Sequence, residues 1–154
     1  MRTEDVSLAH TYNLLGGVTD HLGNFDISLK YYQKLLDNRT KYFGDENADV
    51  ASTYNNIGNV LESQGKYQEA LETFQRALDI KICLGLEHVL VANTKMNMQL
   101  VYGKLGDQTK SMGLYREAHS IYLQSLGQEH PKTRGIAQLL EPPAPTCCCR
   151  CVVS

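Results

Sequence analysis

Apolar and polar residues alternate along most of this chain with the spacing of amphipathic helices. Between Tyr54 and Leu84, apolar or small side chains recur every three or four residues on both sides of Gly65, and a helix places such positions on one face. Glycine readily adopts the left-handed conformation that ends a helix, and the apolar pattern restarts directly afterwards at Tyr67. The stretch therefore predicts two antiparallel helices joined by a tight turn.

The same pattern occurs three times along the chain, which predicts a repeat array. Turn glycines mark the copies at intervals of 42 and 41 residues: Gly23, Gly65 and Gly106. A second glycine series ends the second helix of each copy: Gly44, Gly85 and Gly127. We expect repeats near 5–44, 45–85 and 86–127, with helices near 5–22, 25–42, 47–64, 67–84, 88–105 and 108–125. A short capping helix at 133–140 would cover the end of the stack and complete a domain over 1–140.

The central copy also resembles a known family. Its first helix reads Tyr54-x-x-Ile57-Gly58-x-x-Leu61 and its second reads Ala70-x-x-x-Phe74, which resembles the tetratricopeptide pattern of large, small and aromatic residues. Small residues such as Gly58 and Ala70 fit where two helices cross closely. The resemblance implies an all-α fold, a right-handed superhelical solenoid of three helix-turn-helix repeats with a short C-terminal helix.

The repeat length narrows this resemblance. A unit of about 42 residues, longer than the ordinary 34, with Asn55-Asn56 in the first helix, is similar to the kinesin light chain type. The similarity covers residues 5 to 134. The third copy departs from the pattern, because Lys95, Gln99 and Gln108 replace an aromatic, a small residue and a tyrosine. The expectation is either looser packing in that copy or a neighbour that is missing.

The resemblance further implies that the first helices line a concave groove that binds a partner. Carried onto this sequence, the groove positions are Asn13, Gly17, Asn55, Asn56, Asn59, Asn93, Asn97 and Lys104. An asparagine side chain both donates and accepts hydrogen bonds, so a ladder of them suits the backbone of an extended peptide. Few cations stand among these positions, which disfavours capture of a terminal carboxylate. The alternative is that the asparagines only solvate an exposed helix face.

Composition and charge remove several other function classes. A net charge of -2 offers no basic field for nucleic acid. No signal peptide and no apolar run of about 20 residues is present, so a cytoplasmic protein is expected. His10 and His21 would lie about 16 Å apart on one helix, too far to share a metal ion. With no phosphate loop or nucleophile motif, we expect no enzyme, no cofactor and no metal, but a protein-interaction scaffold.

The last residues carry a separate signal. Prolines at 142, 143 and 145 predict a flexible, disordered tail over 141–154. Cys151-Val-Val-Ser154 matches a prenylation box, and Cys147, Cys148 and Cys149 would be acceptors for palmitate. The alternative function is thus a lipid-anchored adaptor at the cytosolic face of a membrane. The contrary interpretation is that one of four clustered cysteines stands fourth from the end by chance.

Overall fold

The computed structural model of the chain describes residues 3–86 and 88–140, and every regular element in these ranges is a helix. The helices are α1 (Thr3–His21), α2 (Phe25–Phe43), α3 (Ala48–Ser63), α4 (Tyr67–Cys83), α5 (His88–Lys104), α6 (Gln108–Leu126) and α7 (Pro131–Leu140). Their ends lie within two residues of the predicted ends. In the described ranges, no helix is both long and apolar enough to span a bilayer. The predicted lipid acceptors Cys147, Cys148, Cys149 and Cys151 lie outside these ranges.

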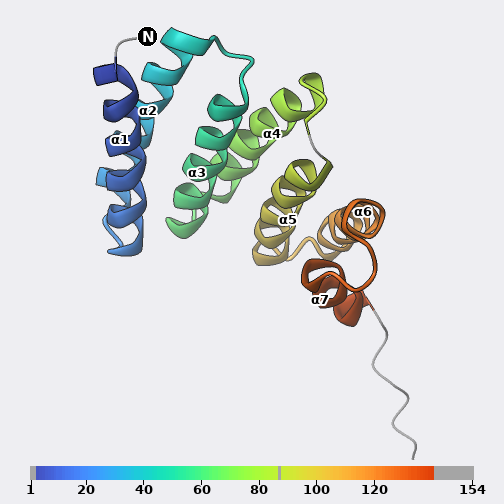
Figure 1. Ribbon diagram of the computed structural model, residues 1–154. Helices are drawn as coiled ribbons and strands as arrows, with labels where there is room; N and C mark the ends of the chain where they lie inside the picture. Colours follow the sequence, from blue (N-terminus) through green and yellow to red (C-terminus); the bar gives the residue numbers. More distant parts are fainter. Residues whose placement is uncertain (1–2, 87, 141–154) are drawn as a thin grey trace, which may run out of the picture.

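The helices form three antiparallel hairpins that stand side by side (Figure 1). Within each hairpin the two helices pack closely, and each second helix also packs on the first helix of the next hairpin. Thus α2 lies against both α1 and α3, α4 lies against both α3 and α5, and α7 closes the series against α6. The prediction of an all-α tetratricopeptide-type solenoid with a short last helix is confirmed.

The turns form as the sequence predicts, because glycine takes up the left-handed backbone there. Gly65 has a φ of 77°, and the backbone N–H of Lys66 donates to the carbonyl of Leu61 at 2.9 Å. That bond satisfies a carbonyl left unpaired at the end of α3. At the other end of the same helix, the Asn47 side chain accepts from the backbone N–H of Asp49 at 2.8 Å, a capping bond.

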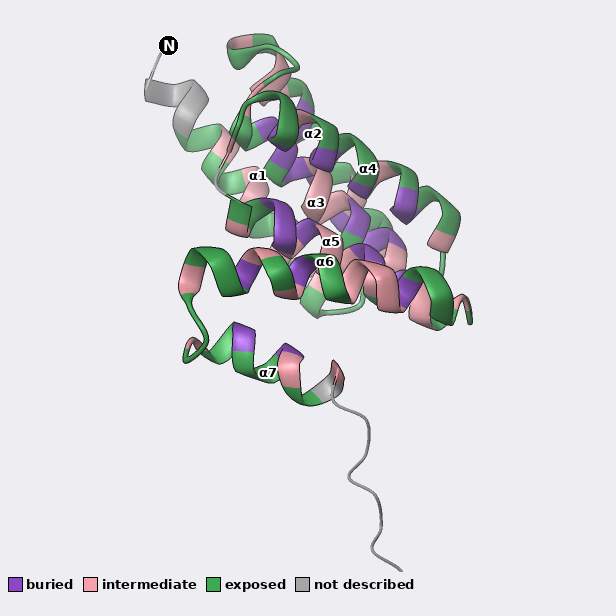
Figure 2. Cartoon of the chain, turned by 90° about the vertical axis from the view of Figure 1, so that its right-hand side faces the viewer, coloured by how far each residue is buried: buried purple, intermediate pink, exposed green. Residues whose placement is uncertain are grey.

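The buried residues lie on the inner sides of the helices (Figure 2) and form three clusters along the series of hairpins. Phe74 of α4 and Val101 of α5 belong to one continuous apolar cluster, which spans the second and third repeats. Ala70 is fully buried where α3 and α4 cross. A single hairpin could not cover its own apolar face, so each repeat is stabilised by its neighbour.

Each contact between successive repeats contains a cation and a threonine as well as apolar side chains. Arg39 on α2 donates from Nη1 to Thr53 Oγ1 on α3 at 2.8 Å. One repeat later, Lys81 on α4 donates from Nζ to Thr94 Oγ1 on α5 at 2.7 Å. Lys81 is 3% exposed, so the second contact holds a buried ammonium group without a carboxylate among its recorded partners.

The third repeat replaces the contacts of the second with contacts of its own. Gln99, which stands where the second repeat has a glycine, donates from Nε2 to Ser111 Oγ at 3.0 Å. Lys95 forms an ion pair with Glu117. These residues stand 41 positions after Tyr54 and Arg76, and in the second repeat Arg76 lies over the Tyr54 ring. The departures from the family pattern are therefore paired with matching changes in the second helix.

Candidate functional site: an asparagine-rich wall on the first helices

The predicted groove residues lie on three successive first helices that run side by side (Figure 1). We call this set the polar wall. Asn13 and Gly17 come from α1, whereas Asn55, Asn56 and Asn59 come from α3. The remaining members, Asn93, Asn97 and Lys104, come from α5. All except Asn59 and Lys104, which are exposed, are half-buried, so the wall remains accessible to solvent at each helix.

Two pairs of asparagines connect neighbouring first helices across the wall. Asn56 donates from Nδ2 to Asn13 Oδ1 at 3.3 Å, joining α3 to α1. Asn97 donates from Nδ2 to Asn59 Oδ1 at 3.2 Å, joining α5 to α3. In the second pair, the Nδ2 of Asn59 and the Oδ1 of Asn97 have no hydrogen-bond partner among the described residues. Both pairs are therefore held in place, and the second still presents a donor and an acceptor.

Asn55 lies deeper than the other asparagines of α3. Its Nδ2 donates to Thr94 Oγ1 on α5 at 3.3 Å, and its Oδ1 is buried without a hydrogen-bond partner in the described part of the chain. A buried acceptor without a partner costs free energy.

The structure does not bring the two remaining members together with these pairs. Asn93 Oδ1 accepts from the Tyr122 hydroxyl at 2.6 Å and from Lys132 Nζ at 3.0 Å, so it ties α5 to α6 and α7. Lys104 forms an ion pair with Glu62 of α3, and hydrogen bonding to that carboxylate raises the pKa of the ammonium group. At this end of the wall, the positive charge of Lys104 is therefore balanced by the carboxylate of Glu62.

Sequence reasoning did not include Glu62 in the wall. The available signal was its position, because Glu62 stands three residues after Asn59 and so shares its helix face. Leu100 was missed in the same way. It stands 41 residues after Asn59, at the equivalent place on α5, and it is 50% exposed. The α5 section of the wall is consequently more apolar than the α3 section.

An apolar hollow of about 530 Å³ opens at the α1 end of the wall. It is lined by residues of α1 and the turn after it, one residue of α2 and one of α3, and three of them belong to the predicted groove: Asn13, Leu14, Gly17, Val18, His21, Leu22, Tyr32 and Asn56. Gly17 lies beside the Tyr32 hydroxyl, since a Cβ at that glycine would stand 3.6 Å from it. The hollow thus has apolar walls beside the side-chain amides of Asn13 and Asn56.

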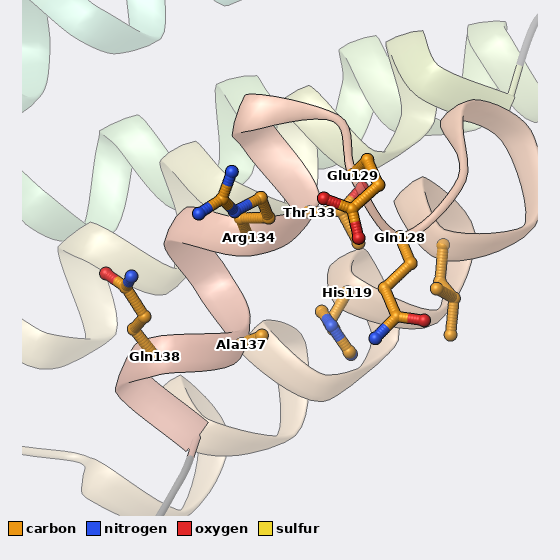
Figure 3. A pocket seen from close by; sticks show the side chains of 8 residues that line it. His119, Gln128, Glu129, Thr133, Arg134, Ala137 and Gln138 are labelled. Carbon is orange, nitrogen blue, oxygen red and sulfur yellow. The ribbon is translucent and has the colours of Figure 1, made fainter.

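A second hollow, of about 480 Å³, lies between α6 and α7 (Figure 3). His119 comes from α6, Gln128 and Glu129 come from the connecting loop, and Thr133 is almost completely buried on α7. Gln138 and Gln128 point in opposite directions (Figure 3). The hollow is lined by polar and charged side chains from α6, α7 and the loop between them.

Chemically, the polar wall offers hydrogen-bond donors and acceptors, an apolar hollow and one neutralised ion pair. Within residues 3–86 and 88–140, no three histidine, cysteine, aspartate or glutamate side chains are grouped so as to hold a metal ion. Asparagine amides do not titrate and are not nucleophiles at ordinary pH. The chemical groups of the wall are therefore mainly amide hydrogen-bond donors and acceptors.

Solved structures with the same fold include BtubC (BKLC) and a putative kinesin light chain. BtubC (BKLC) from P. vanneervenii is 20% identical, with a TM-score of 0.75 over 87% of this chain and 53% of that one. A Podosopora anserina putative kinesin light chain with nearly identical repeats is 15% identical, with a TM-score of 0.72 over 85% and 63%. This chain thus spans between half and two thirds of their length.

A third similar structure contains a bound partner. It is the TPR2AB domain of yeast Sti1 in complex with pHSP90, and it is 19% identical, with a TM-score of 0.65 over 87% of this chain and 48% of that one. No curated protein matches the chain in sequence. Two family models described as tetratricopeptide repeat match residues 7–82 and 91–132. Together they cover most of the three hairpins, and the chain belongs to the tetratricopeptide repeat family.

Proposed function

We propose that the chain is a non-catalytic protein-interaction scaffold that binds an extended peptide of a partner protein along the polar wall, as a kinesin light chain-like adaptor. The observation that carries the proposal is the row of asparagines on α1, α3 and α5, fixed in pairs yet open to solvent. An extended peptide presents backbone N–H and C=O groups at regular intervals, and amide side chains can pair with both.

Side-chain selectivity would come from the apolar surfaces next to the asparagines. The hollow beside Leu14 and Val18 suits an apolar residue of the peptide, and Leu100 offers a second apolar contact on α5. Lys104 is already paired with Glu62, which leaves no free cation among the predicted wall residues. We therefore expect a peptide segment with apolar anchors rather than an acidic segment or a terminal carboxylate.

Pull-down from cell lysate with mass spectrometry tests this function. The intact chain is compared with a variant carrying Asn55→Ala and Asn59→Ala, and with Asn24→Ala, which lies in the turn between α1 and α2. We expect partners that are captured by the intact chain and by Asn24→Ala but lost from the double variant. Equal capture by all three proteins, with unchanged melting temperatures, would contradict the proposal.

A further inference from the structure

The polar wall contains two junctions between first helices, and a carboxylate stands at the equivalent place in each. At the α3–α5 junction, Glu62 of α3 forms an ion pair with Lys104 of α5. Counting back 42 residues from Glu62 gives Asp20 on α1. Counting back 41 residues from Lys104 gives Ser63 on α3, which carries no charge. The α1–α3 junction therefore keeps the carboxylate of this pair and lacks its cation.

No other described residue supplies the missing charge. Asp20 is half-buried, and its carboxylate forms no ion pair within residues 3–86 and 88–140. The cation among the predicted wall residues, Lys104, is already paired with Glu62. A carboxylate with no opposite charge beside it attracts a cation from a ligand, and it does so more strongly when part of its surface is shielded from water.

A buried tyrosine contributes a second polar group at this junction. Tyr32 of α2 is 6% exposed, yet it lines the hollow at the α1 end of the wall, and its hydroxyl lies beside Gly17. That hydroxyl forms no hydrogen bond with the described residues. Burial and, to a smaller extent, the negative charge of Asp20 raise the pKa of Tyr32. The charge of Asp20 therefore acts on the hollow, where the neutral hydroxyl can accept a hydrogen bond.

Three positions differ between the two junctions: the α1–α3 junction has Gly17, Tyr32 and Ser63 where the α3–α5 junction has Asn59, Phe74 and Lys104. The first difference removes a side chain, the second adds a hydroxyl group, and the third removes a cation. The α3–α5 junction is thus completed by its own residues, whereas the α1–α3 junction offers a carboxylate, a hydroxyl oxygen and a hollow. These groups come from α1, α2 and α3, so they do not depend on what lies on the other side of α1.

We propose that the α1–α3 junction binds a lysine or arginine side chain of the partner peptide, whose cation pairs with Asp20 and donates to the Tyr32 hydroxyl oxygen. This inference rests on the function proposed above and specifies the chemical class of one peptide residue. The stem of a basic side chain is aliphatic, so the stem makes the apolar contact in the hollow while the charged end reaches the carboxylate.

Other occupants fit the junction less well. A purely apolar side chain would fill the hollow and withdraw water from Asp20 without balancing its charge, which costs free energy. An acidic side chain would meet a like charge. A divalent metal ion requires several ligands, and in the part of the chain that the structure describes no three histidine, cysteine, aspartate or glutamate side chains are grouped to hold one.

The test begins with a phage-displayed library of random peptides, selected on the intact chain and on single variants. Peptides retained by the intact chain should carry lysine or arginine at one aligned position about threefold more often than the unselected library. Asp20→Asn should remove this preference, because the amide keeps the shape and loses the charge. Ser63→Lys should also remove it, since it supplies the cation that Lys104 supplies at the other junction. Asp79→Asn changes an exposed carboxylate of α4 and should retain the preference.

One selected peptide then provides affinities by fluorescence anisotropy. It is compared with a form in which norleucine replaces the basic residue, because norleucine keeps the aliphatic stem. The intact chain should bind the basic form about fivefold more tightly, and added salt should reduce that difference. Asp20→Asn should bind the two forms equally. Tyr32→Phe, which introduces the residue type of the second repeat, should reduce the difference without removing it.

The outcomes separate this inference from the function on which it rests. An empty selection, or peptides that bind the variant carrying Asn55→Ala and Asn59→Ala as tightly as the intact chain, would contradict the proposed function. Peptides that require these asparagines but show no basic preference would overturn the basic site alone. So would a preference for lysine over norleucine that is unchanged in Asp20→Asn and Ser63→Lys. Ser63 is exposed, so Ser63→Lys provides the test even if circular dichroism shows that Asp20→Asn is unfolded.

Discussion

Phe74 of α4 lies directly against the backbone of Gly58 in α3. A Cβ atom at position 58 would stand 2.5 Å from Cε1 and 2.7 Å from Cδ1 of the Phe74 ring. Real side chains do not approach so closely, so the helix crossing exists only because residue 58 has no side chain. Tyr32 stands against Gly16 in the first repeat in a similar way.

Replacing this glycine should separate the two helices. We predict that Gly58→Ala lowers the free energy of unfolding by about 1–3 kcal/mol, since Phe74 is buried and has little room to move. Gly113→Ala is the matched control, because a Cβ there meets no atom within 4 Å. The control should raise stability by about 0.5–1 kcal/mol through helix propensity. Urea unfolding measures both, and equal effects of the two changes would contradict the packing account.

A second prediction follows from the buried Lys81. Burial lowers the pKa of its ammonium group to about 8, from 10.5 in an exposed lysine. Between these two values the unfolded chain binds more protons than the folded chain, so stability must rise with pH in that window. Above pH 10 stability should instead fall as the pH rises. Burial raises the pKa of Tyr32 and Tyr122, so ionisation of these tyrosines destabilises the folded chain.

We expect urea unfolding to show a gain on the order of 1 kcal/mol between pH 8 and pH 9.5, given about 1.4 kcal/mol for each unit of pH and proton. Lys81→Met keeps the aliphatic stem and removes the titrating group, so the gain should disappear in that variant. A pH dependence that is the same in both proteins would show that Lys81 is not the responsible group.

The ion pair at the end of the polar wall gives a third prediction. Glu62→Gln removes the partner of Lys104 and leaves a free cation beside the asparagines. Stability should change by less than about 1 kcal/mol, as for other ion pairs with an exposed member. Binding of peptides with an acidic or free carboxyl end should increase and become sensitive to salt. Lys104→Met in the same background is the control, and an increase that persists in it would exclude Lys104 as the cause.

The fold could be predicted from the sequence because each repeat contains residues that mark its helix ends and helix crossings. Left-handed glycines such as Gly65 and small crossing residues such as Gly58 and Ala70 determine where helices end and meet. Such signals depend on neighbours in the chain, and they recur three times. Even the altered third repeat keeps the pattern, because Gln99 is matched by a hydrogen bond to Ser111.

The polar wall could be predicted only in part. Repeat register placed the asparagines on the correct helices, but their partners depend on how far one first helix is shifted against the next. That shift pairs Asn59 with Asn97 and Asn56 with Asn13, and it directs Asn93 toward Tyr122 instead. Contacts between residues about 40 positions apart depend on the tertiary packing of whole helices, which single-sequence patterns do not specify.

The most direct test of the central claim follows the asparagine side chains themselves during binding. Nuclear magnetic resonance of the ¹⁵N-labelled chain resolves side-chain amide signals, which can be monitored while a peptide from a captured partner is added. The account predicts that the signals of Asn55, Asn59 and Asn97 shift together with saturation, whereas that of Asn24 does not. Shifts confined to the second helices α2, α4 and α6, with these three asparagine signals unmoved, would contradict it.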